Sequence, residues 1–178
     1  EPLRARHLSL GRMSTPAVDV VIAVHSRTRP IARAVASVLN GSETPVHVIV
    51  VAHNIDASII AANLGDLADD PAVTVVQLND GIRSPAGPFN AGIAAGTAPY
   101  CAVLGAAEER APGAVASWMR RAAQTGADVV IGKIAIGDRV DPYPPVRIGR
   151  RDRLAPAADR LAYRSAPLGL ISRVRFGG

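Results

Sequence analysis

Short apolar runs alternate with amphipathic and loop-forming stretches along most of this 178-residue chain. Five runs, most of them rich in valine, predict strands at residues 18–24, 46–51, 73–78, 100–104 and 128–136. Near-continuous apolar runs are typical of strands buried on both faces, as in a parallel sheet. We therefore expect eight residues of these runs to be almost fully buried: Val21, Ile22, Ile49, Val50, Val75, Val103, Leu104 and Val130.

The intervals between the strands predict helices over residues 31–39, from after Asp56 to about Leu67, over 90–96 and over 112–125. Pro30 suits a first helical turn, and Gly126 suits a helix end. Strands that alternate with helices through short loops form right-handed βαβ units. The chain is therefore predicted to be an α/β protein with a mainly parallel sheet and helices on both faces.

The two ends of the chain depart from this pattern. Residues 1–12 are polar and basic and precede Met13, so we interpret them as an upstream extension or a cloning remnant. Residues 13–136 hold the predicted α/β domain. Residues 137–178 are rich in proline and arginine and are predicted to continue that domain irregularly, with one more strand or turn within 165–178.

Positive charge is concentrated near the carboxyl end. The net charge is +5, and basic and acidic residues balance over residues 1–136, so the whole excess lies in residues 137–178. Such a segment is either solvated or a basic surface that meets phosphates or makes peripheral contact with an anionic membrane. Aromatic residues make up 3% of the chain, which disfavours nucleic acid as a partner.

Two further features bear on the compartment. No apolar run reaches 18 residues, so no membrane span is predicted. Cys101 is the only cysteine, which excludes an intrachain disulfide and favours the cytoplasm. Its place in an apolar strand predicts an unreactive buried thiol.

Ligands of such sheets bind beyond the carboxyl ends of the strands, here loops 25–29, 52–56, 79–90 and 105–111. Motifs for a dinucleotide, a P-loop or a nucleophile elbow are absent. What the loops offer is a set of polar side chains: His25, Arg27, His53, Asn54, Asp56, Asp80, Arg83, Asn90, Glu108 and Glu109. Each histidine is either a hydrogen-bonded loop residue or part of a site, and the glutamates either stabilise a helix start or bind a ligand.

Four stretches resemble glycosyltransferase family 2, which has the GT-A fold. They read VDVVIAVHSRTRPIARAVASVL, VHVIVVAHNIDA, GPFNAGIAAGTAPYCAVLGAAEERAPGAV and GADVVIG, in this order from Val18 to Gly132. The resemblance implies a Rossmann-like domain in which the first strand lies between the second and the fourth. It also implies a nucleotide-diphosphate sugar as donor and an acceptor of unknown kind, whether glycan, lipid-linked or small molecule.

The nucleotide sugar is expected to contact residues at the strand ends: Val24, His25, Arg27, His53, Asn54, Asp56, Asp80 and Asn90. In the family an Asp-x-Asp pattern after the fourth strand holds a divalent metal on the diphosphate. Gly105 and Ala107 occupy those positions here, and Phe89 replaces a frequent arginine. The chain ends at a "GG" that resembles a turn before the acceptor-side segment, so no catalytic base is assigned.

Three arrangements of a metal such as Mn²⁺ or Mg²⁺ stay open. Glu108 alone anchors the ion, His25, His53 and Glu108 form a small site, or no ion binds. We expect weak or absent binding in the free protein. The function is accordingly an active glycosyltransferase, a degenerate nucleotide-sugar-binding or scaffolding module, or a nucleotidyltransferase-type enzyme, whose basic loop would contain the glycine and lysine that residues 25–30 lack.

Overall fold

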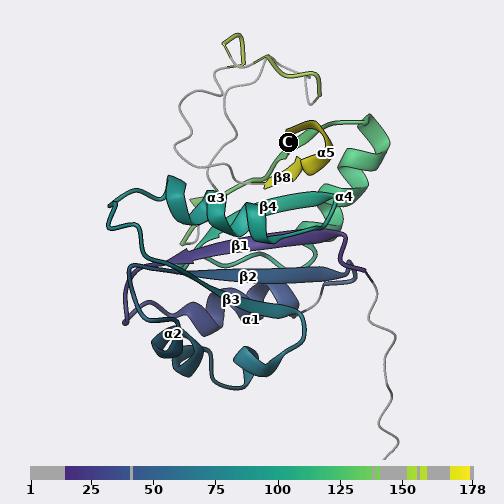
Figure 1. The fold of residues 1–178 in the computed structure, drawn as a ribbon. Coiled ribbons are helices and arrows are strands. Elements are labelled where there is room, and N and C mark those ends of the chain that lie inside the picture. Colours follow the sequence, from purple (N-terminus) through teal and green to yellow (C-terminus); the bar gives the residue numbers. More distant parts are fainter. Residues whose placement is uncertain are drawn as a thin grey trace, which may run out of the picture.

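A computed structural model describes residues 15–40, 42–137, 139–140, 152–155, 157–159 and 169–176. Six strands form one sheet in the order β3-β2-β1-β4-β8-β5. Their bounds are β1 Val18–Val24, β2 Val46–His53, β3 Val73–Leu78, β4 Tyr100–Gly105, β5 Val129–Ile131 and β8 Gly169–Ser172. Figure 1 shows β8, β4, β1, β2 and β3 following one another from top to bottom.

The centre of the sheet is parallel. β1 pairs in parallel with β2 on one side and with β4 on the other, and β3 pairs in parallel with β2. The predicted place of the first strand is therefore confirmed. β8 runs antiparallel to both β4 and β5. The α/β, Rossmann-like fold with a mainly parallel sheet is confirmed, and the added strand expected within residues 165–178 is β8.

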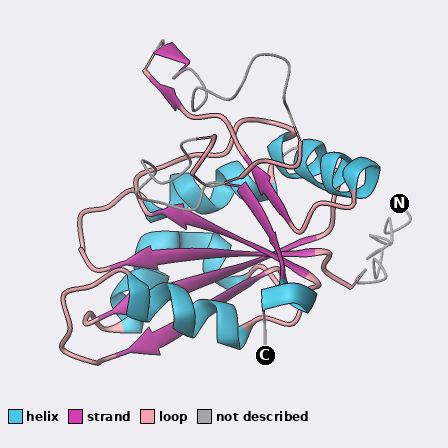
Figure 2. Ribbon diagram, turned by 90° about the horizontal axis from the view of Figure 1, so that it is seen from above, coloured by secondary structure: helices cyan, strands magenta, loops and turns pink. Residues whose placement is uncertain are grey.

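Helices cover both faces of the sheet, as predicted (Figure 2). Their bounds are α1 Ile31–Leu39, α2 Ala57–Leu64, α3 Ala86–Ala95, α4 Ala114–Thr125 and α5 Arg173–Phe176, with a 3₁₀ turn, η1, at Gly65–Asp69. Along β1, Val20 and Ile22 point into the larger core beneath α1, α2 and α4. Val21 points to the opposite face, where Phe89 and Ile93 of α3 pack. This alternation explains why nearly every residue of β1 is apolar.

Helix α3 begins four residues before the predicted Asn90. Ala86 is its first residue, and the backbone N–H of Ala86 donates to the Ser84 hydroxyl at 3.2 Å. Pro85 precedes that turn, where a missing N–H costs nothing. The Gly/Pro-rich composition of this stretch therefore concealed a first helical turn.

The predicted strand 128–136 is wrong as one continuous element. It divides into β5 and a separate strand, β6 Ala135–Ile136, which pairs with β7 Arg139–Val140 in a two-stranded sheet. The break begins at Gly132, where a side-chain carbon in place of the glycine hydrogen would lie 2.8 Å from the Trp118 ring. Only a glycine lets the chain pass this close to Trp118, and the backbone then leaves the main sheet.

Seven of the eight predicted core residues are buried, and Val75 is the exception. Val75 is only half-buried because β3 is an edge strand of the sheet. Cys101 is buried as predicted, and its burial raises the pKa of the thiol.

The face beneath α3 also buries a charged side chain that the apolar pattern did not predict. Asp19 of β1 is 0% exposed. Its Oδ2 accepts hydrogen bonds from the Ala98 N–H at 2.8 Å and from Arg173 Nη2 at 2.9 Å. Arg173 also donates to the carbonyl oxygens of Ala98 and Ile93, at 2.9 and 2.5 Å. This buried network joins β1, the end of α3 and the segment β8–α5.

Two sequence predictions lie outside the described residues. The extension at residues 1–12 is one, and most of the irregular, basic segment at 137–178 is the other. Among the described residues, no helix combines the length and the apolar character needed to cross a membrane.

Candidate functional site

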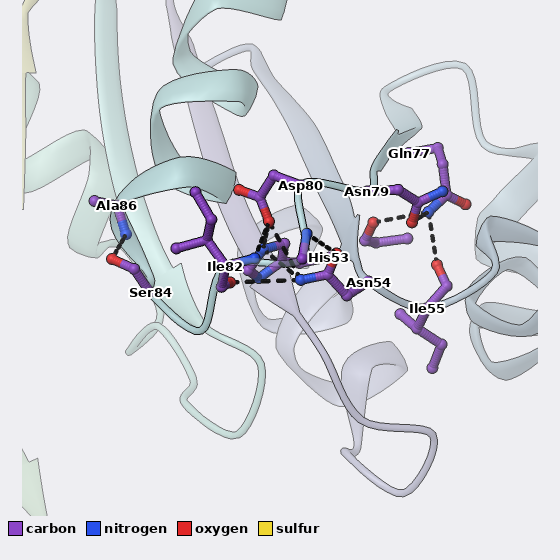
Figure 3. A network of polar contacts seen from close by, with 11 residues as sticks. His53, Asn54, Ile55, Gln77, Asn79, Asp80, Ile82, Ser84 and Ala86 are labelled. Carbon is purple, nitrogen blue, oxygen red and sulfur yellow. Dashed lines mark hydrogen bonds and ion pairs between the residues drawn. The ribbon is translucent and has the colours of Figure 1, made fainter.

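Three polar side chains from two adjacent strand ends meet at the carboxyl edge of the sheet (Figure 3). His53 is the last residue of β2, and its Nε2 lies 2.8 Å from Oδ1 of Asp80, which follows β3. Asn54 Nδ2 lies 3.0 Å from His53 Nε2 and donates to Asp80 Oδ1 at 3.3 Å. The sequence placed these residues after the second and third strands, and the parallel pairing of β2 with β3 brings them into contact.

Asn54 holds this cluster together through its backbone and its amide. Its φ of 54° is left-handed, a conformation that asparagine tolerates better than most residues. The side-chain oxygen of Asn54 accepts from the Gly81 N–H at 3.0 Å, and its backbone N–H donates to the Leu78 carbonyl oxygen at 2.8 Å. The loop after β3 is thereby fastened to the end of β2.

Asp80 is ionised at neutral pH. The backbone N–H of Ile82 donates to Oδ1 at 2.9 Å, and this bond, followed by the one from His53, lowers the pKa of the carboxyl below its usual value. An ionised carboxylate is purely an acceptor, so Asp80 suits ligand N–H and O–H groups. His53 is only 6% exposed, and its hydrogen bond to Asp80 comes from the buried side of the cluster.

Gln77 is a positioning residue that the sequence analysis missed. Its amide donates to the Ile55 carbonyl at 2.8 Å and to Asn79 Oδ1 at 2.7 Å, and its oxygen accepts from the Ala57 N–H at 2.7 Å. These bonds tie the loop after β2 to the end of β3 (Figure 3). The available signal was a polar residue near the end of a largely apolar strand.

Asp56 has a structural role in the same loop. It is the N-cap of α2 and accepts from the Ser58 N–H at 2.8 Å. Hydrogen bonding from Ser58, with a smaller contribution from the positive charge of Arg27, lowers the pKa of Asp56. Its predicted contact with a nucleotide stays a prediction.

The remaining predicted contacts lie on β1 and α3. Val24 is 1% exposed, so only its backbone is available to a ligand at the strand end. His25 and Arg27 are exposed in the following loop, and Asn90 is exposed on α3. None of these three side chains joins the cluster of His53, Asn54 and Asp80.

Glu108 is hydrogen-bonded to the backbone at the end of β4. Its Oε2 accepts from the Gly105 N–H at 2.8 Å, while Ala107 is exposed without a polar side chain. Glu109 is turned toward α1, where it forms an ion pair with Arg33 at 2.7 Å. In the part of the chain that the structure describes, no three His, Cys, Asp or Glu residues lie close enough to hold a metal ion.

Arg110, also missed from the sequence, fastens the loop after β4. Its guanidinium lies 4.7 Å from the centre of the Trp118 ring and donates to the Val103 carbonyl. Burial lowers its pKa to about 10, and it stays charged at neutral pH. No local pattern marks this arginine, because Trp118 and Val103 come from other elements.

Comparison with known proteins decides the family. A family model described as Glycosyl transferase family 2 matches residues 19–166. The chain belongs to glycosyl transferase family 2. No curated protein matches it.

Solved structures similar to this family 2 chain support the fold. S. aureus TarS 1–349 superposes with a TM-score of 0.72 and 14% identity, over 87% of this chain and 46% of TarS. Its complex with UDP-GlcNAc gives 0.68 and 14%, over 87% and 45%. Mannosyltransferase PcManGT from Pyrobaculum calidifontis, in complex with GDP-Man and Mn²⁺, gives 0.56 and 16%, over 93% and 48%. The chain therefore spans about half the length of these neighbours.

Proposed function

We propose that this family 2 chain binds a nucleotide-diphosphate sugar at the carboxyl edge of its sheet and transfers the sugar to an acceptor. The observation that carries the proposal is the cluster of His53, Asn54 and Asp80, built at the ends of β2 and β3. It lies at the carboxyl edge, where sheets of this topology bind ligands. The strand order changes direction between β1 and β4, and β2 is the neighbour of β1 on the other side.

The cluster suits the nucleoside part of such a donor. Asp80 presents an ionised acceptor, and Asn54 is exposed beside it. Bases and riboses carry N–H and O–H groups that such acceptors bind. Because His53, Asn54 and Asp80 hold one another, the acceptor is oriented before a ligand arrives, which reduces the entropy lost on binding.

Two neighbours support a nucleotide sugar as the ligand. One TarS structure is a complex with UDP-GlcNAc, and the PcManGT structure is a complex with GDP-Man. The single buried cysteine of this chain supports placing the protein in the cytoplasm.

A catalytically degenerate nucleotide-sugar-binding module is the second candidate. It is favoured by the end of β4, where Gly105 and Ala107 replace the family's metal-binding pair and Glu108 is bonded to the backbone. Nucleotide binding is common to both candidates. Turnover of a bound nucleotide sugar in the presence of candidate acceptors separates them.

The cluster predicts which substitutions weaken binding. Titrating the chain with UDP-, GDP-, dTDP- and CDP-linked sugars is expected to identify one preferred nucleotide. His53→Ala removes the support of Asp80, and we expect about tenfold weaker binding of that nucleotide, as for loss of a hydrogen bond to a charged group. Asn54→Gly removes the amide while keeping the left-handed backbone, and Asn54→Ala is expected to weaken binding at least as much.

His47→Ala is the matched control, because His47 lies at the opposite end of the same strand, against Asp19 and Thr74. It is expected to leave nucleotide affinity unchanged. Thermal unfolding of each variant separates lost binding from lost structure. Absence of any nucleotide binding at millimolar concentration would rule out the proposed function.

A further inference from the structure

At the end of β4, where the family pattern places a metal, a glutamate side chain is hydrogen-bonded to the backbone. Glu108 folds back so that its carboxylate accepts the Gly105 N–H at 2.8 Å. A side-chain carbon on Gly105 would lie 3.0 Å from the Glu108 carboxyl carbon, a tight contact. A side chain at position 105 would therefore require the Glu108 carboxylate to shift by a few tenths of an ångström.

Each of the other carboxylates at this edge has a protein partner of its own, and they do not converge on one point. Asp80 is bonded to His53 and Asn54, Asp56 caps α2, and Glu109 pairs with Arg33. A divalent ion on a diphosphate prefers hard carboxylate ligands, and among the described residues no three candidate ligands meet. The described residues at this edge of the sheet do not fit such an ion.

Positive charge is available from the loop between β1 and α1. Ala23 of β1 pairs with Gly105 of β4, so the loop that starts at His25 leaves the sheet beside the end of β4. Arg27 and Arg29 are exposed in this loop, which contains no acidic residue. Within the described ranges, the Arg29 guanidinium has no hydrogen-bond or ion-pair partner, and Arg27 acts on Asp56 only through its charge.

Guanidinium groups match phosphate oxygens through planar pairs of N–H donors, and they keep their charge at neutral pH. We propose that the chain binds its nucleotide diphosphate without a divalent metal, and that Arg27 and Arg29 supply the compensating positive charge. This inference rests on the proposed function, because it concerns the phosphates of the same ligand. It deepens that function by assigning the residues that bind the diphosphate.

The test is calorimetric titration of the chain with UDP and GDP, once with EDTA and once with MnCl₂. We expect the two conditions to give the same Kd within about twofold. Arg27→Gln and Arg29→Gln should each weaken UDP or GDP binding about tenfold, the loss expected for a charge-assisted hydrogen bond. Neither should change the binding of uridine or guanosine, which lack phosphates.

Arg33→Gln is the matched control, because Arg33 follows on α1 but is paired with Glu109. It should leave UDP and GDP affinity unchanged. Binding that requires Mn²⁺ would overturn this inference and leave the proposed function standing. No binding in either condition would reject the proposed function and this inference together. Unchanged affinity in both Arg27→Gln and Arg29→Gln would overturn the assignment of the arginines.

A direct manganese titration adds an independent readout. We expect the wild-type chain to bind Mn²⁺ no better than Glu108→Gln does, both without UDP and with it, because the Glu108 carboxylate accepts a backbone hydrogen bond. Tight Mn²⁺ binding by the wild type would contradict the inference. Loss of such binding in Glu108→Gln would then assign the ion to Glu108.

Discussion

Val21→Asp is expected to abolish folding of the domain. Val21 lies at the centre of β1, is 0% exposed, and packs beneath α3 against Ile49, Val51 and Val103. An aspartate there would be a buried charge without a partner, at a cost of several kcal/mol. Because domains of this size are stable by only about 5–15 kcal/mol, we expect the cooperative unfolding transition to be lost or strongly lowered in temperature.

Thermal and urea unfolding followed by circular dichroism measure this effect. Val129→Asp is the matched control, since Val129 carries the same side chain on edge strand β5 and is 47% exposed. That variant is expected to change the free energy of unfolding by less than about 1 kcal/mol. A Val21→Asp protein that unfolds cooperatively near the wild-type temperature would show that β1 is not the centre of the sheet.

Asp19→Ala is expected to have the second largest effect, by removing a charge from the same face of the same strand. Asp19 lies two residues before Val21, and its carboxylate bonds to Arg173 and to the Ala98 N–H. Without it, Arg173 remains largely buried with an uncompensated charge. Breaking a buried pair in this way costs about 3–5 kcal/mol.

The expected consequence is a large fall in the free energy of unfolding, measured by urea denaturation. Asp128→Ala is the control, because Asp128 pairs with Arg175 at 3.2 Å between side chains that are 42% and 71% exposed. Exposed pairs contribute at most about 1 kcal/mol. Equal effects of the two substitutions would mean that the Asp19–Arg173 pair is not buried in solution.

Asp19→Asn separates the effect of the negative charge on stability from that of the side chain's size and shape. The amide keeps an oxygen that accepts the Ala98 N–H, but it leaves Arg173 without a negative partner. We expect a stability between those of the wild type and Asp19→Ala. Because Arg173 follows β8 directly, Asp19→Asn and Asp19→Ala should also increase hydrogen exchange in β8 before they affect β2.

The sequence predicted which residues lie at the ends of the strands, but not the contacts among them. His53, Asn54 and Asp80 were predicted from their places after two apolar runs, because parallel strands bring their carboxyl ends to one edge. Their mutual hydrogen bonds depend on the left-handed backbone at Asn54 and on the route of the loop after β3. Gln77 and Arg110 were missed because their partners come from separate elements.

By itself, the sequence determined the α/β class, the strands β1 to β4 and the edge at which a ligand is expected. These features follow from the periodicity of apolar residues and from glycine and proline at the ends of elements, which are local properties. Only the tertiary structure decided the features that join distant parts. Asp19 bonds to Arg173, 154 residues away, Glu108 turns back to Gly105, and β8 lies between β4 and β5. A buried charge is acceptable only where folding delivers its partner, and no local pattern records where that partner will come from.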